Sequence, residues 1–178
     1  MKRSVTPFAF VAIAAALAMA SAAHAQAVPG FGAFTTPPGA GELPDPQRAY
    51  KVIFDLAQGG PDDQPLKNLQ RVARLANILE TGGVSADHRH IVVVIHGGAT
   101  PAILTDAAWN ARGRGPANPN RPLIRALLDA GIEIRLCGQS MTASSISSSE
   151  IEPGVSIDVA AMMTVIHHQQ DGYAVIFN

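Results

Sequence analysis

Two residues with reactive side chains stand where predicted strands end. Cys137 follows the predicted strand 132–136, and His96 follows the largely apolar segment 90–95. A thiolate is the nucleophilic form of cysteine, and an imidazole beside it can move a proton or orient the sulfur. Cys137 and His96 are therefore candidate catalytic residues. Gly138 has no side chain, so another group or the backbone can approach the sulfur closely.

Cys137 is also the single cysteine of the 178-residue chain, so no disulfide can form within one molecule. Three interpretations remain open for this thiol. It is buried and inert, it pairs with the same residue of another chain, or it is kept for its reactivity.

The elements that must position these residues alternate between strands and helices. Strands are predicted at 50–57, 90–95, 132–136, 155–158 and 173–177, and helices near 66–79, 100–110, 123–128 and 159–171, with a short helix or mobile segment at 140–149. Such alternation over short links predicts an α/β fold with a mainly parallel sheet of about five strands and helices on both faces. Ligands bind beyond the carboxyl ends of such strands, which favours the loops 58–63, 96–100 and 137–141.

The amino-terminal segment predicts export. Residues 1–25 combine Lys2 and Arg3, an apolar run of 13 residues and a small-residue cleavage site ending at Ala25, which is typical of a cleavable signal peptide. We expect a periplasmic protein with no stable membrane span, because this run is shorter than the ~20 residues a spanning helix needs. Residues 26–49 are rich in proline and glycine and are predicted to form a flexible arm before the domain at 50–178.

Composition argues against several function classes. Loss of Lys2 and Arg3 would leave 11 of the 13 basic residues against 14 acidic ones, a net charge of −3 that gives no sign of nucleic-acid binding. The pairs His88/His90 and His167/His168 bring no third ligand at a recognisable spacing, so no metal is expected. No nucleotide-binding glycine motif occurs, and no cofactor is expected.

Several segments together resemble the DsrE/DsrF-like (YchN-like) sulfur-relay family. They are the strand and turn at 92–97, the stretch 123–134, the tetrad Cys137-Gly138-Gln139-Ser140, and the segment 169–174. The resemblance covers most of residues 50–178, and the tetrad is its most specific part.

The resemblance implies a three-layer α/β/α sandwich that assembles as a trimer or hexamer. It also implies that Cys137 carries sulfane sulfur as a persulfide, with His96 nearby and with substrate-binding residues Gly97, Gly138, Gln139 and Ser140. The expected partners are a sulfur donor and an acceptor thiol, on a protein or a small molecule. The alternative is a non-catalytic oligomeric binding or assembly module in which Cys137 packs at a subunit interface.

Overall fold

A computed structural model describes residues 26–177 of the chain. The predicted signal peptide and its cleavage site at residues 1–25 lie outside the described residues. None of the helices within 26–177 has the length and apolarity that crossing a membrane requires.

Five parallel strands form one sheet in the order β4-β3-β2-β1-β5. Their bounds are β1 Tyr50–Leu56, β2 Arg89–Ile95, β3 Glu133–Cys137, β4 Ser156–Asp158 and β5 Ala174–Phe177. The central strand β2 is apolar on both faces, which is the usual pattern of a parallel strand that is covered by helices on both sides. Residues 91–95 of β2 are all buried.

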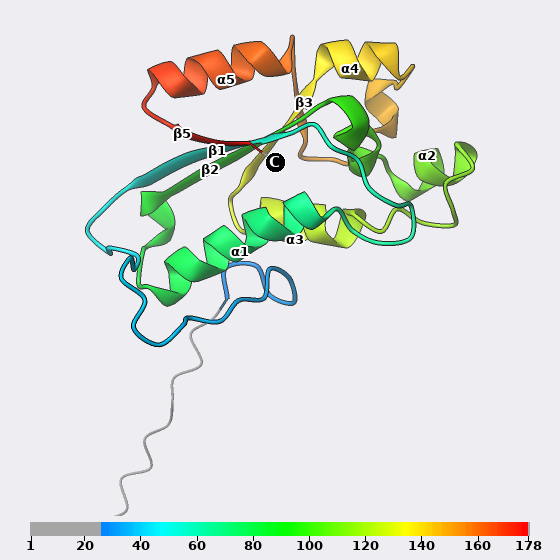
Figure 1. The fold of residues 1–178 in the computed structure, drawn as a ribbon. Helices are drawn as coiled ribbons and strands as arrows, with labels where there is room; N and C mark the ends of the chain where they lie inside the picture. The colour runs from blue at the N-terminus through cyan, green and yellow to red at the C-terminus, as the bar shows by residue number, and fades with distance from the viewer. Residues whose placement is uncertain (1–25, 178) are drawn as a thin grey trace, which may run out of the picture.

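Helices cover the two faces unequally (Figure 1). On one side lie α1 and α3, and the core there is extensive. On the other side α5 packs over a small cluster that includes Ile53, Val92, Val94 and Cys137. The helices are α1 Lys67–Thr81, α2 Asp106–Ala111, α3 Arg121–Asp129, α4 Gly138–Ala143 and α5 Ala161–Gln170, with short 3-10 helices η1 Ala86–His88, η2 Gly97–Ile103 and η3 Ser148–Glu150. The predicted α/β fold with its mainly parallel sheet is confirmed.

The helix expected at 100–110 is wrong in detail, because the segment is divided into η2 and α2. Thr105 caps α2 by accepting the N–H of Ala108 at 3.3 Å, whereas the side chain of Thr100 caps nothing and is fully buried. Leu104 between the two helices is extended and pairs with Ile151. This pairing interrupts the helical hydrogen bonds and ends η2.

The arm at 26–49 contains no helix or strand, yet its first part is anchored on α1. Asn77 is fully buried and holds the arm by three hydrogen bonds: Oδ1 accepts the N–H of Val28 at 2.8 Å, and Nδ2 donates to the carbonyls of Val28 and Phe31 at 3.3 and 2.8 Å. Val28 itself is fully buried in the main core. The flexible arm predicted from proline and glycine content is thus held against α1 near its start. Composition does not reveal these contacts, because they depend on the side-chain amide of a single buried residue.

Candidate functional site

Three polar side chains lie at the carboxyl edge of the sheet on the face covered by α5. Asp55 is near the end of β1, His96 directly follows β2, and Cys137 ends β3. The pairing of Leu56 with Ile95 and of Ile95 with Leu136 places these strand ends side by side. Side chains alternate along a strand, so Asp55 shares the face of Ile53, and His96 and Cys137 continue the same face.

These residues line a cavity of about 360 Å³. The sheet edge contributes Asp55, His96 and Cys137, and the start of α4 contributes Gln139. The remaining lining residues are Ala160, directly before α5, and Ala161, Met162, Val165 and Ile166 of α5 itself. The cavity therefore has a polar wall on the sheet and an apolar wall on α5. Met162 is 69% exposed and Ile166 is 43% exposed, so the apolar wall continues to the protein surface.

Cys137 is only 5% exposed, and α4 begins directly after it, two residues before the short helix or mobile segment expected at 140–149. Burial alone raises the pKa of a thiol. Hydrogen bonding from the backbone N–H groups of Ser140, Ala161 and Gln139 and from the Ser140 hydroxyl outweighs burial, so that the pKa of Cys137 lies below its ordinary value. The site therefore favours the nucleophilic thiolate.

His96 is held by a partner that the sequence analysis did not identify. Its Nε2 lies 2.5 Å from Oδ1 of Asp55, with side-chain exposures of 28% for His96 and 20% for Asp55. Because an ionised carboxylate only accepts hydrogen bonds, Nε2 carries the proton. One sequence signal for Asp55 existed: it is the acidic residue in the otherwise apolar stretch 52–56.

The other predicted site residues divide into one that lines the cavity and three that shape it. Gln139 lines it and donates from Nε2 to the carbonyl of Val159 at 3.1 Å. Ser140 Oγ accepts the N–H of Gly97 at 3.1 Å, which ties the loop after β2 to α4. A Cβ on Gly138 would lie 2.8 Å from the carbonyl oxygen of Asp158, so only glycine allows β4 to end this close to Cys137.

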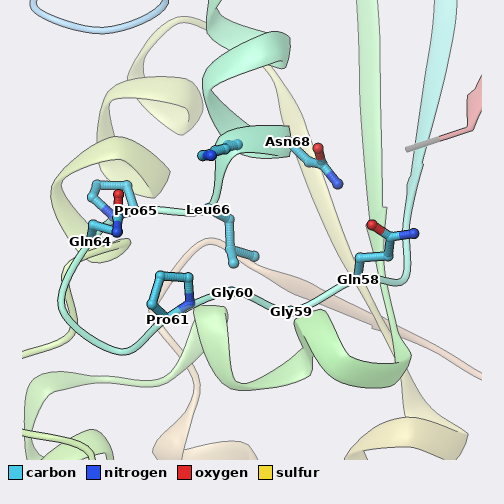
Figure 2. Close-up of a pocket in the computed structure, with 9 residues that line it drawn as sticks. Gln58, Gly59, Gly60, Pro61, Gln64, Pro65, Leu66 and Asn68 are labelled. Carbon is cyan, nitrogen blue, oxygen red and sulfur yellow. The ribbon is translucent and has the colours of Figure 1, made fainter.

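A second pocket, of about 220 Å³, lies on the loop between β1 and α1 (Figure 2). Its lining residues, among them Gln58, Gly59, Leu66 and Asn68, are all different from those of the Cys137 cavity. Gly59 is needed for packing, because a Cβ there would lie 2.5 Å from the carbonyl oxygen of Gly98. This close approach fixes the loop after β1 against the loop that carries His96.

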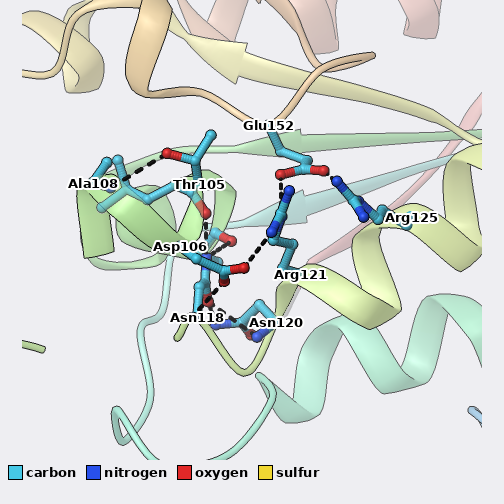
Figure 3. Close-up of polar contacts among 10 residues, drawn as sticks. Thr105, Asp106, Ala108, Asn118, Asn120, Arg121, Arg125 and Glu152 are labelled. Carbon is cyan, nitrogen blue, oxygen red and sulfur yellow. Dashed lines mark hydrogen bonds and ion pairs between the residues drawn. The ribbon is translucent and has the colours of Figure 1, made fainter. Parts of the chain in front are cut away.

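A buried carboxylate fixes the segment that leads from α4 to β4 (Figure 3). Glu152 is 2% exposed and receives Arg121 Nε at 2.6 Å and Arg125 Nε at 2.5 Å. Arg121 also pairs with Asp106 of α2. These contacts join α2 and α3 to the chain that enters β4, whose end approaches Gly138.

No group of three or more histidine, cysteine, aspartate or glutamate side chains within residues 26–177 is arranged to hold a metal ion. Cys137 and His96 make no hydrogen bond with each other. Both residues line the same cavity of about 360 Å³, so a molecule bound there can contact the sulfur and the imidazole together.

Comparison with solved structures identifies the same fold in two proteins. The protein of unknown function MTH1491 from Methanobacterium thermoautotrophicum aligns with a TM-score of 0.56 at 16% identity, over 72% of this chain and 99% of that one. The ychN protein from E. coli aligns with a TM-score of 0.51 at 18% identity, again over 72% and 99% of the two chains. A comparison with curated proteins found no matching relative.

A family model supplies the classification that these distant structural similarities do not. The model of the DsrE/DsrF-like family matches residues 51–177, which is the whole sheet and its helices apart from Tyr50. This family is associated in general with sulfur relay. The chain belongs to the DsrE/DsrF-like family.

Proposed function

We propose that this protein is an exported carrier of sulfane sulfur, or a sulfurtransferase-like protein, that holds the sulfur as a persulfide on Cys137. The observation that carries the proposal is a thiol with a lowered pKa that lines a cavity with His96 and Asp55. Family membership gives the general direction, since the family is associated with sulfur relay.

The chemistry needs no redox cofactor. The Cys137 thiolate attacks the outer sulfur of a donor R–S–SH, a new S–S bond forms, and the donor leaves as R–S⁻. An acceptor thiolate then attacks the outer sulfur of Cys137–S–SH and regenerates the Cys137 thiolate. Both steps exchange one S–S bond for another, so electrons balance.

The test is sulfur loading of the mature chain. Purified protein is incubated with the persulfide of mercaptoethanol, and intact mass is measured before and after treatment with cyanide, which removes sulfane sulfur as thiocyanate. We expect one added sulfur on the wild type and none on Cys137→Ser. Two added oxygens nearly equal one sulfur in mass, but a sulfinic acid resists cyanide and thiols, so the treatment separates the two. A wild-type protein that gains no cyanide-sensitive sulfur would refute the proposal.

One observation favours the alternative of an assembly module with Cys137 at an interface. Exposed apolar side chains surround the cavity side of the molecule, including Val159 at 73%, Met162 at 69% and Phe177 at 72%. A homo-oligomer, trimer or hexamer, would cover them. Under this alternative Cys137 stays unreactive toward iodoacetamide until the protein unfolds, whereas a carrier thiol reacts in native buffer.

Export is part of the proposal and has its own test. Cleavage after Ala25 would leave Gln26 as the first residue of the mature chain. Cell fractionation and amino-terminal sequencing of the full-length product check this. An uncleaved product retained in the cytoplasm would contradict it.

A further inference from the structure

The hydrogen bond between His96 and Asp55 decides which ring nitrogen is available to the cavity. Nε2–H is committed to the Asp55 carboxylate at 2.5 Å. Nδ1 makes no hydrogen bond to any residue of 26–177. Asp55 therefore fixes both the tautomer and the ring orientation, and it leaves Nδ1 as the nitrogen that can exchange a proton with a bound molecule.

The lining of the cavity isolates this nitrogen from other acids and bases. Asp55, His96 and Cys137 are its titratable residues, while the residues from α5 are aliphatic or thioether side chains. The sheet register puts the position of His96 beside that of Cys137, one strand away. A donor whose outer sulfur meets Cys137 would place its leaving sulfur in the same small space as the imidazole.

We propose that Asp55 positions the His96 imidazolium so that its Nδ1–H protonates the thiolate that leaves the sulfur donor. The inference rests on the persulfide function proposed above. The step is Cys137–S⁻ + R–S–SH + His96–H⁺ → Cys137–S–SH + R–SH + His96, in which one S–S bond forms, one breaks and the proton moves from Nδ1 to the leaving sulfur. His96 is the acid, and Asp55 is a positioning residue that holds the imidazole ring through Nε2.

The proposal explains why a partly buried carboxylate occupies position 55 of β1. The neighbours of Asp55 in β1, Phe54 and Leu56, are almost fully buried, and an aliphatic residue at position 55 would extend the apolar cluster of Ile53 on the same face. Replacing a partly buried ion pair by apolar residues is often neutral or stabilising. A carboxylate at this position is thus better explained by the chemistry of the cavity than by the stability of the sheet.

The test is the single-turnover rate of sulfur loading in three variants: Asp55→Asn, His96→Gln and the double variant. With the persulfide of mercaptoethanol as donor, we expect Asp55→Asn to slow loading about tenfold and His96→Gln to slow it at least as much. This effect is smaller than general acid catalysis usually contributes, because thiolates leave without strong assistance. Since Asp55 acts through His96, Asp55→Asn should cause no further loss in the His96→Gln background.

A second reagent separates proton donation from a merely structural role. Dithiodipyridine is an uncharged disulfide whose leaving thiolate is stable without a proton. Its rate with Cys137 should be the same in the wild type and in all three variants. This reaction also reports that the cavity and the thiol are intact in each variant.

The outcomes distinguish this inference from the proposed function. If the wild type loads sulfur and Asp55→Asn loads it equally fast, the inference fails and the carrier function stands. The inference also fails if Asp55→Asn slows both reagents alike or adds to the effect of His96→Gln. If the wild type gains no sulfane sulfur while its thiol reacts with dithiodipyridine, the carrier function fails and the inference fails with it.

Discussion

The hydroxyl of Ser140 allows the origin of the thiolate at Cys137 to be tested. Ser140 acts on the sulfur through its backbone N–H and through its side chain, and both lower the pKa of the Cys137 thiol against the opposing effect of burial. The substitution Ser140→Ala removes only the hydroxyl and leaves the backbone N–H groups in place. We therefore expect the pKa of Cys137 to rise in this variant.

The magnitude follows from the loss of the hydrogen bond between the Ser140 hydroxyl and the thiolate; the bond from the Gly97 N–H to Ser140 Oγ is lost as well, but it does not act on the sulfur. Hydrogen bonds to charged groups contribute about 1.5 kcal/mol at the low end, which makes the thiolate roughly tenfold rarer at a pH below the pKa of the thiol. A more basic thiolate is also a better nucleophile. With a Brønsted coefficient of about 0.4–0.5, each thiolate of the variant reacts roughly threefold faster than a thiolate of the wild type, which offsets part of the tenfold loss. Alkylation by iodoacetamide should then be roughly threefold slower at a pH well below the pKa of the wild-type thiol and roughly threefold faster once both proteins are fully ionised.

The assay is the iodoacetamide rate across pH for the wild type, Ser140→Ala and Thr142→Ala. Thr142 lies in the same short helix, and its hydroxyl donates to the carbonyl of Gly138 at 2.9 Å and takes no part in lowering the pKa of Cys137, so it serves as the matched control. The two pH profiles of wild type and Ser140→Ala should cross. Superimposable profiles, or a variant that is slower at every pH, would refute the assignment of the lowered pKa to this hydrogen bond.

Three further predictions concern the arm, the buried ion pair and the donor. Asn77→Ala removes three hydrogen bonds, two of them buried, and should lower the free energy of unfolding in urea by about 2–4 kcal/mol. Gln70→Ala, which loses one bond to Gly32, should lose less than half of that, and equal losses would contradict the anchoring role. Glu152→Gln should cost about 1–3 kcal/mol in the same assay, since it removes the carboxylate that pairs with Arg125 and one of the two that pair with Arg121; an unchanged stability would show that the pairing is dispensable. Thiosulfate should load Cys137 more slowly than an uncharged persulfide, because no lysine or arginine lines the cavity to receive a dianion, and equal loading rates would count against this cavity as the donor site.

Local sequence determined the elements that a short-range pattern can encode. The run at 91–95 is apolar at every position, so it forms a strand that is buried on both faces wherever the domain folds. Glycines mark places where the backbone must turn or be approached, as at Gly138 beside the end of β4. Alternation of such strands with helices over short links was sufficient to predict a parallel sheet. Cys137 and His96 could be identified as candidates because each stands at the carboxyl end of a predicted strand.

Tertiary structure decided which side chains meet at that edge. Asp55 lies 41 residues before His96, and only the parallel register of β1 with β2 brings its carboxylate to the imidazole. The anchoring of the arm likewise depends on Asn77, 49 residues after Val28. Hydrophobic periodicity is a property of neighbouring residues and reports which face is buried, whereas a hydrogen bond between distant residues depends on strand order and register. The sequence by itself therefore determined the layers of the fold and the position of its thiol, and the partner of the histidine came only with the assembled sheet.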